Sequence, residues 1–146
     1  MLRKFIIILV ALCAFALGMK QLREPDVWWQ LLAGRWMLEH GAVTHTDVFS
    51  YTMHGAKWIN VKWLYEILIA LFEKAGGPQS VILLQALVNV LIAYLLIRTI
   101  KYMKGLADNE LSVFSIAVPV LLFFAVNEYR MSGRPEMVSH LMSVLY

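Results

Sequence analysis

The chain has 146 residues, and 60% of them are hydrophobic, compared with about 45–50% in an ordinary soluble domain. Its formal net charge is +3 and its basic residues form no long run, which excludes the strongly basic surface that binds nucleic acids, so we expect no nucleic-acid partner. With a mean hydropathy of +0.66, the sequence predicts an all-α membrane protein. Its transmembrane helices are joined to an extracytoplasmic loop that contains interfacial amphipathic helices.

Residues 1–20 are predicted to form the first transmembrane helix. The run from Phe5 to Met19 is apolar and lies between basic residues, near the short limit of roughly 17–25 residues for a membrane span. A cleaved signal peptide has a similar pattern, but further apolar segments follow, so we favour an uncleaved anchor. Cys13, the single cysteine, cannot form an intramolecular disulfide and is interpreted as a small buried hydrophobe.

Residues 21–78 are predicted to form an extracytoplasmic loop that is rich in tryptophan. This segment contains all five tryptophans of the chain, and tryptophan gathers at the membrane–water interface. The stretch "WLYEILIALF" at 63–72 is too short to span a bilayer and is predicted as an interfacial or re-entrant helix. Residues 42–53 are rich in β-branched and aromatic side chains and are predicted to be extended.

Within this loop, Pro25 to His40 is predicted to form a helix. Pro25 suits the first turn, where its missing N–H costs nothing, and Asp26 complements the helix dipole there. Gly41 is a natural stop just past the last turn. Five positions at helical spacing predict one apolar face lying in the plane of the interface: Trp29, Leu32, Ala33, Trp36 and Met37.

The rest of the chain consists of apolar segments separated by a Gly-Gly-Pro break at 76–78 and by short polar loops. Pro119 lies inside one of these segments, which a membrane helix tolerates. The predicted segments are a second transmembrane helix at 79–98, a cytoplasmic loop at 99–110, a third transmembrane helix at 111–127, an extracytoplasmic loop at 128–136 and the incomplete start of a fourth helix at 137–146. A segment of that last length cannot cross a hydrocarbon core of about 30 Å, so we expect the sequence to be the front part of a longer protein.

The basic residues of the short loops predict the orientation. Arg3 and Lys4 precede the first apolar run, and Arg98, Lys101 and Lys104 follow the second, which favours these ends inside the cell. The chain is therefore predicted to be a multi-pass protein of the bacterial inner membrane with a cytoplasmic N-terminus. The tryptophan-rich loop and the 128–136 loop would then both face outward.

The two outer loops gather acids and arginines. A carboxylate can act as general base on an acceptor hydroxyl, and arginine forks bind phosphate oxygens in pairs. These residue types predict a substrate that is a phosphate-linked lipid with its head group at the interface. The candidate residues are Asp26 and Glu24 for catalysis, and Arg134, Arg130, Trp28, Trp29, His45 and Asp47 for substrate binding.

Several of these candidates also have plain structural interpretations. Glu24 can be a solvated acid after a span, and Asp26 can serve the helix dipole alone. The tryptophans are more often interfacial anchors than sugar-stacking platforms, and the arginines can be charges that snorkel at a helix end. No metal site is assigned. His45 and Asp47, two residues apart, are weak indicators of one, although a divalent metal cofactor stays open.

The segment "EPDVWWQLLAGRWMLEHGAVTHTDVFSYTMHGAKWINVKWLYEIL" carries a series of motifs in order. They are an acid-x-Asp, a Trp-Trp-x-Leu-x-x-Gly helix, a His-Gly, an Asp-x-Phe-Ser-Tyr-Thr and a Trp-x-x-x-x-Trp-Leu-x-Glu, followed later by the dipeptide Arg134-Pro135. The segment resembles the first outer loop of bacterial multi-spanning glycosyltransferases of the GT-C type. Similar sequences often have His-Glu where this chain has Val61-Lys62, which puts a role for that turn in doubt.

The resemblance implies a polytopic helical enzyme that transfers a sugar from a polyprenyl-phosphate donor at the outer face of the membrane. By position it implies Asp26 as the catalytic acid and Glu24 as its partner, and some relatives need a divalent metal. The predicted function is thus that of a membrane glycosyltransferase-like protein acting on an extracytoplasmic acceptor, with membrane lipid and a polyprenyl-phosphate-linked sugar as partners. Only about three spans are predicted, too few for a complete catalytic cavity.

The alternative is a small non-catalytic membrane subunit or a protein that binds lipid or a partner, or else a truncated and inactive gene product. A transporter fragment is less favoured, because the apolar runs of the predicted spans carry no charged residue of the kind that marks a substrate path. These runs are Phe5 to Met19, Val81 to Ile97 and Leu111 to Val126.

Overall fold

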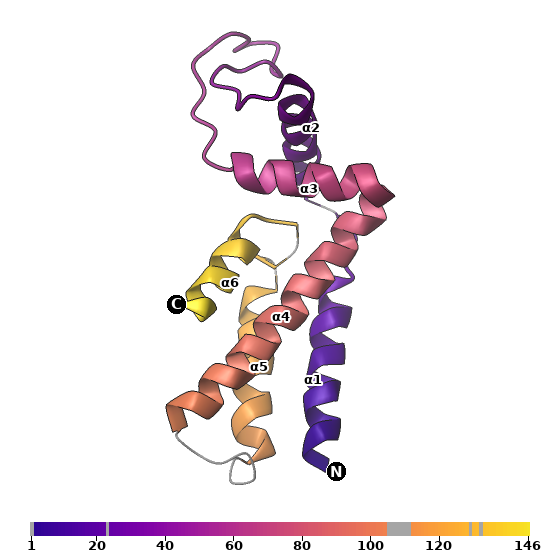
Figure 1. Cartoon of the computed structure of the whole chain (residues 1–146), viewed down its shortest axis with the longest axis vertical. Helices are drawn as coiled ribbons and strands as arrows, with labels where there is room; N and C mark the ends of the chain where they lie inside the picture. The colour runs from indigo at the N-terminus through magenta and orange to yellow at the C-terminus, as the bar shows by residue number, and fades with distance from the viewer. Residues whose placement is uncertain (1, 23, 105–111, 129, 132) are drawn as a thin grey trace. The chain divides into compact units, whose positions relative to one another are not determined.

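The computed structural model describes residues 2–22, 24–104, 112–128, 130–131 and 133–146. These residues form six α-helices and no β-strand, so the predicted all-α class is confirmed (Figure 1). The chain divides into two compact units. Unit 1 comprises residues 1–23 and 82–146, and unit 2 comprises residues 24–81.

Unit 2 is built on helices α2 (Pro25–His40) and α3 (Trp63–Gly76). The predicted helix from Pro25 to His40 is confirmed at both ends, with Asp26 in its first turn. Gly41 ends it in the left-handed conformation, with φ of 65°, and donates its backbone N–H to the carbonyl oxygen of Met37 at 2.9 Å. Glycine adopts this conformation without steric penalty. The helix therefore ends at Gly41, the residue that the sequence predicted as its stop.

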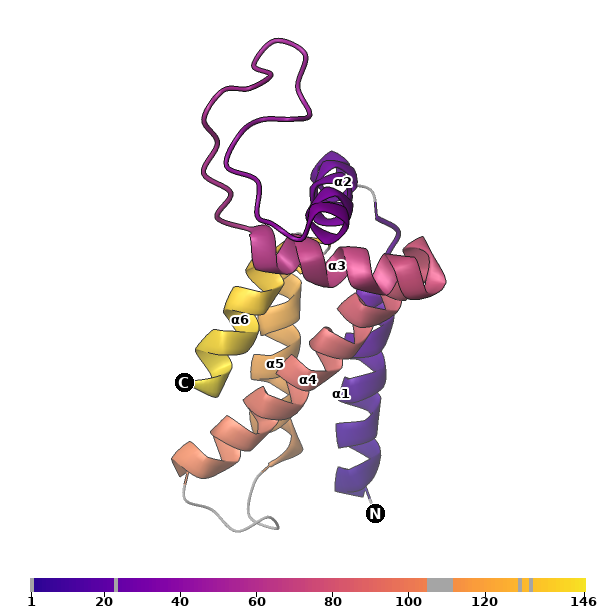
Figure 2. The same ribbon diagram turned by 45° about the horizontal axis from the view of Figure 1, so that its top comes forward.

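Helices α2 and α3 pack against each other, as Figures 1 and 2 show. They approach closely at Gly34, where an added Cβ would lie 2.6 Å from the carbonyl carbon of Glu66 and 2.8 Å from the Cβ of Ala70. On the outer side, Arg35 Nε and Nη2 donate to the two carboxylate oxygens of Glu73 at 3.0 and 2.5 Å. The apolar side chains buried in unit 2 come mainly from these helices: Val27, Leu31, Met37, Tyr65, Ile69 and Ala70.

The structure divides the apolar face that was predicted for α2. Ala33 and Met37 are buried, whereas Trp29 and Leu32 are exposed. Gly34 has no side chain, so α3 can approach α2 closely at this position. Val27, seven residues earlier on the same face of α2, is also buried. The face that packs is therefore set by the glycine rather than by the largest apolar residues.

The segment at 42–53, which was predicted to be extended, contains one bridge residue and no strand. A single antiparallel bridge joins Thr46 to Lys57, and the Trp58 N–H donates to the carbonyl oxygen of His45 at 2.8 Å. The Asp47 N–H donates to the carbonyl oxygen of Ala56 at 2.8 Å. The segment is thus one arm of an irregular hairpin. Its backbone pairing extends as far as Asp47, where the turn begins.

Unit 1 contains α1 (Leu2–Gly18), most of α4 (Pro78–Lys104), α5 (Val113–Asn127) and α6 (Glu136–Leu145). The break before α4 is confirmed at Gly77, which has φ of 71°. Among the described residues, one helix is long and apolar enough to cross a membrane, at Pro78–Met103 with a mean hydropathy of 2.4. The apolar parts of α1 and α5 are shorter, at Phe5–Gly18 and Phe114–Asn127.

The loop predicted at 99–110 needs correction, because α4 continues to Lys104. Its apolar and helix-favouring residues continue the helix through the basic cluster that suggested an end. The remainder of that loop, 105–110, and the predicted start of the third helix at 111 lie outside the described residues. In the 128–136 loop, residues 129 and 132 lie outside them as well, and α6 begins at Glu136.

A buried amide ties unit 1 together. Gln85, which is 1% exposed, donates its Nε2 to the carbonyl oxygen of Gly18 at 2.7 Å and accepts the Gly133 N–H on its Oε1 at 2.7 Å. Lys20 also pairs with Glu128. One side chain of α4 thereby satisfies backbone groups at the end of α1 and in the turn before α6, groups that would otherwise be buried unpaired.

Candidate functional site

Asp26 and Glu24, the predicted catalytic acids, lie at the N-terminus of α2. The Asp26 side chain is exposed, and its Oδ1 accepts a hydrogen bond from Trp29 Nε1 at 3.3 Å. Glu24 is half-buried just before the helix, and its carbonyl oxygen accepts the Val27 N–H at 3.2 Å. The positive end of the helix dipole favours negative charge at this place. The Asp26 carboxylate is thus open to solvent and fixed to an indole one turn along.

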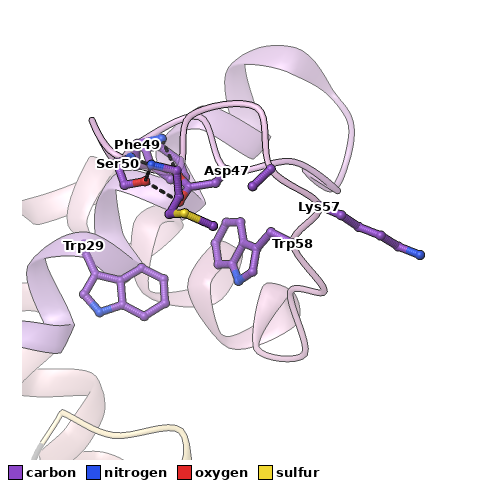
Figure 3. Close-up of a pocket in the computed structure, with 8 residues that line it drawn as sticks. Trp29, Asp47, Phe49, Ser50, Lys57 and Trp58 are labelled. Atoms are coloured by element: carbon purple, nitrogen blue, oxygen red, sulfur yellow. Dashed lines mark hydrogen bonds between the residues drawn. The ribbon is translucent and has the colours of Figure 1, made fainter.

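That indole lines a hollow of about 490 Å³ in unit 2 (Figure 3). Such a volume lies within the usual range of small-molecule sites, roughly 300–1,000 Å³. The ring centroids of Trp29 and Trp58 are 5.9 Å apart with the planes tilted by 56°, and Phe49 meets Trp58 edge-on at 6.1 Å. The lining residues are mainly aromatic or apolar and include Trp29, Phe49, Met53, Ala56 and Trp58.

Asp47 also lines the hollow, but its carboxylate is used to hold a turn. Oδ1 accepts the backbone N–H groups of Phe49 and Ser50, both at 2.9 Å, and Oδ2 accepts the Ser50 hydroxyl at 2.5 Å. The Ser50 hydroxyl, followed by the two N–H groups, holds the pKa of Asp47 below its ordinary value. Figure 3 shows this group of bonds beside the hollow. Both carboxylate oxygens of Asp47, the residue predicted to bind substrate, therefore already accept hydrogen bonds within the protein.

Two lysines supply positive charge near the indoles. Lys62 Nζ lies 5.9 Å from the ring centroid of Trp29, within the range of a cation–π contact. Lys57 is among the residues that line the hollow, and its side chain extends away from Trp58 in Figure 3. The hollow therefore has an apolar wall and basic groups close to it.

Glu66 is the acid of the Trp-Leu-x-Glu motif, but it was not among the predicted site residues. Its side chain is fully buried in α3, and its Oε2 accepts a hydrogen bond from Asn60 Nδ2 at 2.5 Å. Burial raises the pKa of Glu66, and this outweighs the opposing effects of the Asn60 amide and the Lys62 charge. Its Oε1 has no hydrogen-bond partner among the described residues. The signal in the sequence was a lone acid in the middle of an apolar helical run.

The remaining candidates are distributed over both units. Trp28 and His45 belong to unit 2, where both side chains are exposed and neither is among the lining residues of the hollow. Arg130 and Arg134 belong to unit 1, where Arg130 is exposed and Arg134 is half-buried next to Gly133. Of the predicted residues, the hollow brings together Trp29 and Asp47, and Asp26 joins them through the Trp29 indole.

His45 and Asp47 were weak indicators of a metal site. Within the part of the chain that the structure describes, no group of three or more His, Cys, Asp or Glu side chains is arranged to hold a metal ion. The chemical groups that this site does offer are an exposed carboxylate, an aromatic wall and nearby lysine charge.

Comparisons of the chain with protein-family models, with curated proteins and with solved structures give no match.

Proposed function

We propose that this chain is part of a membrane glycosyltransferase of the GT-C type, which transfers a sugar from a polyprenyl-phosphate donor to an extracytoplasmic acceptor. The observation that carries the proposal is the exposed carboxylate of Asp26, bonded to the Trp29 indole that lines an aromatic hollow. The order of motifs in residues 24–66 and the resemblance that they carry support it.

The surroundings of Asp26 suit a donor that is both apolar and anionic. The indoles and Met53 would contact the isoprenoid part or the sugar face, because aromatic and thioether groups prefer apolar surface. Lysines attract phosphate as compact point charges, and Lys57 and Lys62 are the lysines near the indoles. Arg130 and Arg134 lie in unit 1, and their role as ligands of a phosphate group stays a prediction.

In the proposed step, Asp26 acts as general base. Its carboxylate takes the proton of the acceptor hydroxyl as that oxygen attacks the anomeric carbon of the donor. The new carbon–oxygen bond forms while the bond between the anomeric carbon and the phosphate oxygen breaks, and the electron pair leaves with polyprenyl phosphate. The proton stays on Asp26 until solvent removes it, and Glu24 assists as the neighbouring acid.

The same proposal places the protein in the bacterial inner membrane as a multi-pass chain with a cytoplasmic N-terminus. The candidate span at Pro78–Met103 supports a membrane location. The basic residues beside it, and those before the first helix, support the orientation. Unit 2 would then lie at the outer face, where polyprenyl-phosphate sugars present their head groups.

The test is an assay of sugar transfer by membranes that contain the full-length protein, followed as release of polyprenyl phosphate from a polyprenyl-phosphate-linked hexose. Asp26→Asn removes the base but keeps the shape, so we expect the rate to fall by about 100-fold or more. The control is Glu39→Gln, which changes another exposed acid of the same helix and should leave the rate unchanged. An Asp26→Asn protein with the wild-type rate would remove Asp26 from the mechanism.

One observation favours a second candidate function, a non-catalytic protein that binds lipid or a partner. Trp28 is 52% exposed and Trp29 37% exposed, and large exposed aromatic side chains often mark binding surfaces. Under this alternative, Trp28→Ala with Trp29→Ala would abolish binding, while Asp26→Asn would have no effect on it. Transfer activity that depends on Asp26 would decide against this alternative.

A further inference from the structure

Residues 51–64 of unit 2 expose an unusual amount of apolar surface. We call this stretch, "YTMHGAKWINVKWL", the basic apolar segment. It runs from the tip of the hairpin to the first turn of α3. Its exposed apolar side chains are Tyr51 at 98%, Met53 at 59%, Ile59 at 73%, Val61 at 80%, Trp63 at 41% and Leu64 at 65%.

The charged residues of the basic apolar segment are all positive. Lys57 and Lys62 are its charged residues, and the sequence contains no acid between Asp47 and Glu66. Of the two flanking acids, Glu66 is fully buried, and the Asp47 carboxylate is bonded to Phe49 and Ser50 within its turn. The segment itself therefore presents apolar side chains with two lysines and no acid.

The segment is held in place at both ends. The Thr46–Lys57 bridge closes the hairpin, and the Met53 N–H donates to the Ser50 hydroxyl at 3.2 Å. At the other end, Asn60 accepts the Lys62 N–H on its Oδ1 at 3.0 Å and is anchored to α3 through Glu66. A surface that is already ordered loses less conformational entropy on binding.

We infer that the basic apolar segment docks onto the surface of an anionic phospholipid bilayer. Exposed apolar side chains enter the boundary between head groups and acyl chains, and tryptophan favours that depth. The lysines lay their apolar stems along this region while their ammonium groups reach the lipid phosphates. An anionic surface is selected because each lysine near it contributes attraction that a neutral bilayer does not supply.

This docking shares Met53, Lys57 and Lys62 with the donor contacts proposed above, but it does not involve the Asp26 carboxylate. It also differs from the interfacial role predicted for α2, since part of that helix's apolar surface is buried in unit 2.

The experiment uses the full chain with Cys13→Ser, which removes its single cysteine, and Val61→Cys labelled with an environment-sensitive NBD dye. The labelled protein is reconstituted in phosphatidylcholine vesicles with or without phosphatidylglycerol. The control carries the dye at Glu39→Cys, an exposed position of α2 outside the segment. We expect blue-shifted emission and protection from acrylamide quenching at position 61 in the anionic vesicles, and neither change at position 39.

The matched variant adds Lys57→Gln and Lys62→Gln. Each lysine should account for roughly a fivefold change in the docking equilibrium, so the double variant should lose the response to phosphatidylglycerol, and high salt should weaken it in the parent protein. Asp26→Asn should leave the response intact, which separates this inference from the enzymatic one. Equal emission at position 61 in both kinds of vesicle, with the helical content unchanged by circular dichroism, would overturn the inference. An equal shift at position 39 would overturn it as well.

Discussion

Glu66 illustrates how burial changes the chemistry of a single residue. In the sequence it is one acid in an apolar run, yet in the structure it is fully buried and bonded to Asn60. Asn60 in turn accepts the Lys62 N–H, so the protonation state of Glu66 acts on the junction between the hairpin and α3. Ionising the carboxyl would leave a buried negative charge with an oxygen that has no hydrogen-bond partner among the described residues.

The stability of unit 2 should therefore depend on pH through Glu66. Burial raises its pKa, so the stabilising contribution is fully present below the ordinary glutamate pKa of about 4.3 and is lost as pH rises through the folded value. Glu66→Gln keeps a neutral side chain of the same shape and should remove this loss. All five tryptophans lie in unit 2, so denaturant unfolding followed by tryptophan fluorescence at several pH values measures it. Identical pH profiles for the two proteins would contradict this account of Glu66.

Asp47 shows the opposite shift and a different use of a carboxylate. Its bonds to Phe49 and Ser50 favour the ionised form, so its contribution is present above the ordinary aspartate pKa and is lost as pH falls through the lower folded value. Asp47→Ala should raise hydrogen exchange at the Phe49 and Ser50 amides by roughly tenfold, since both lose their acceptor. The exposed Glu39 in α2 provides the control, as Glu39→Ala should leave these two rates unchanged. Wild-type exchange in Asp47→Ala would mean that the carboxylate does not hold the turn.

At the scale of elements, the packing of α2 on α3 depends on Gly34. A methyl group there would meet the backbone of Glu66 and the side chain of Ala70, and a backbone cannot move aside as a flexible side chain can. Gly34→Ala should therefore lower the free energy of unfolding of unit 2 by about 1–3 kcal/mol, although alanine favours helix.

Denaturant unfolding followed by tryptophan fluorescence also measures this effect. Glu39→Ala, in the same helix but exposed, should shift stability by no more than about 0.5 kcal/mol. If Gly34→Ala were as stable as Glu39→Ala, the close approach of the two helices would not exist in solution.

Local signals explain which elements could be predicted from the sequence. Pro25, Gly41 and Gly77 each act within one or two residues of a helix end, so the bounds of α2 and the break before α4 could be found without a structure. The end of α4 at Lys104 could not, since basic residues mark a membrane boundary without ending a helix. The packing face of α2 could not be predicted either, because it depends on the Glu66 backbone of α3, which lies against Gly34.

The candidate site divides in the same way. Asp26 and its place in the first turn follow from sequence spacing, but its bond to Trp29 and the hollow beyond it depend on where the hairpin folds. Asp47 was predicted to bind substrate because it is one of the acids that gather in the outer loop. Only the arrangement of Phe49 and Ser50 shows that its oxygens are already engaged.

At the scale of the whole molecule, the two units have different proposed roles. Unit 1 contains most of the candidate span at Pro78–Met103, and the proposed function uses it to hold the protein in the membrane. Unit 2 contains the acid of α2, the aromatic hollow and the basic apolar segment. Because polyprenyl-phosphate sugars and an outer acceptor meet at one face of the membrane, the central claim is that unit 2 lies at the outer face.

Cysteine labelling in bacterial spheroplasts tests this claim most directly. With Cys13→Ser as background, Glu39→Cys places a single thiol on the exposed side of α2, and Met103→Cys places one near the end of α4, where Met103 is 79% exposed. We predict that a membrane-impermeant maleimide labels position 39 in intact spheroplasts and position 103 only after lysis. Protection of position 39 until lysis would place the Asp26 site inside the cell and contradict the proposed function.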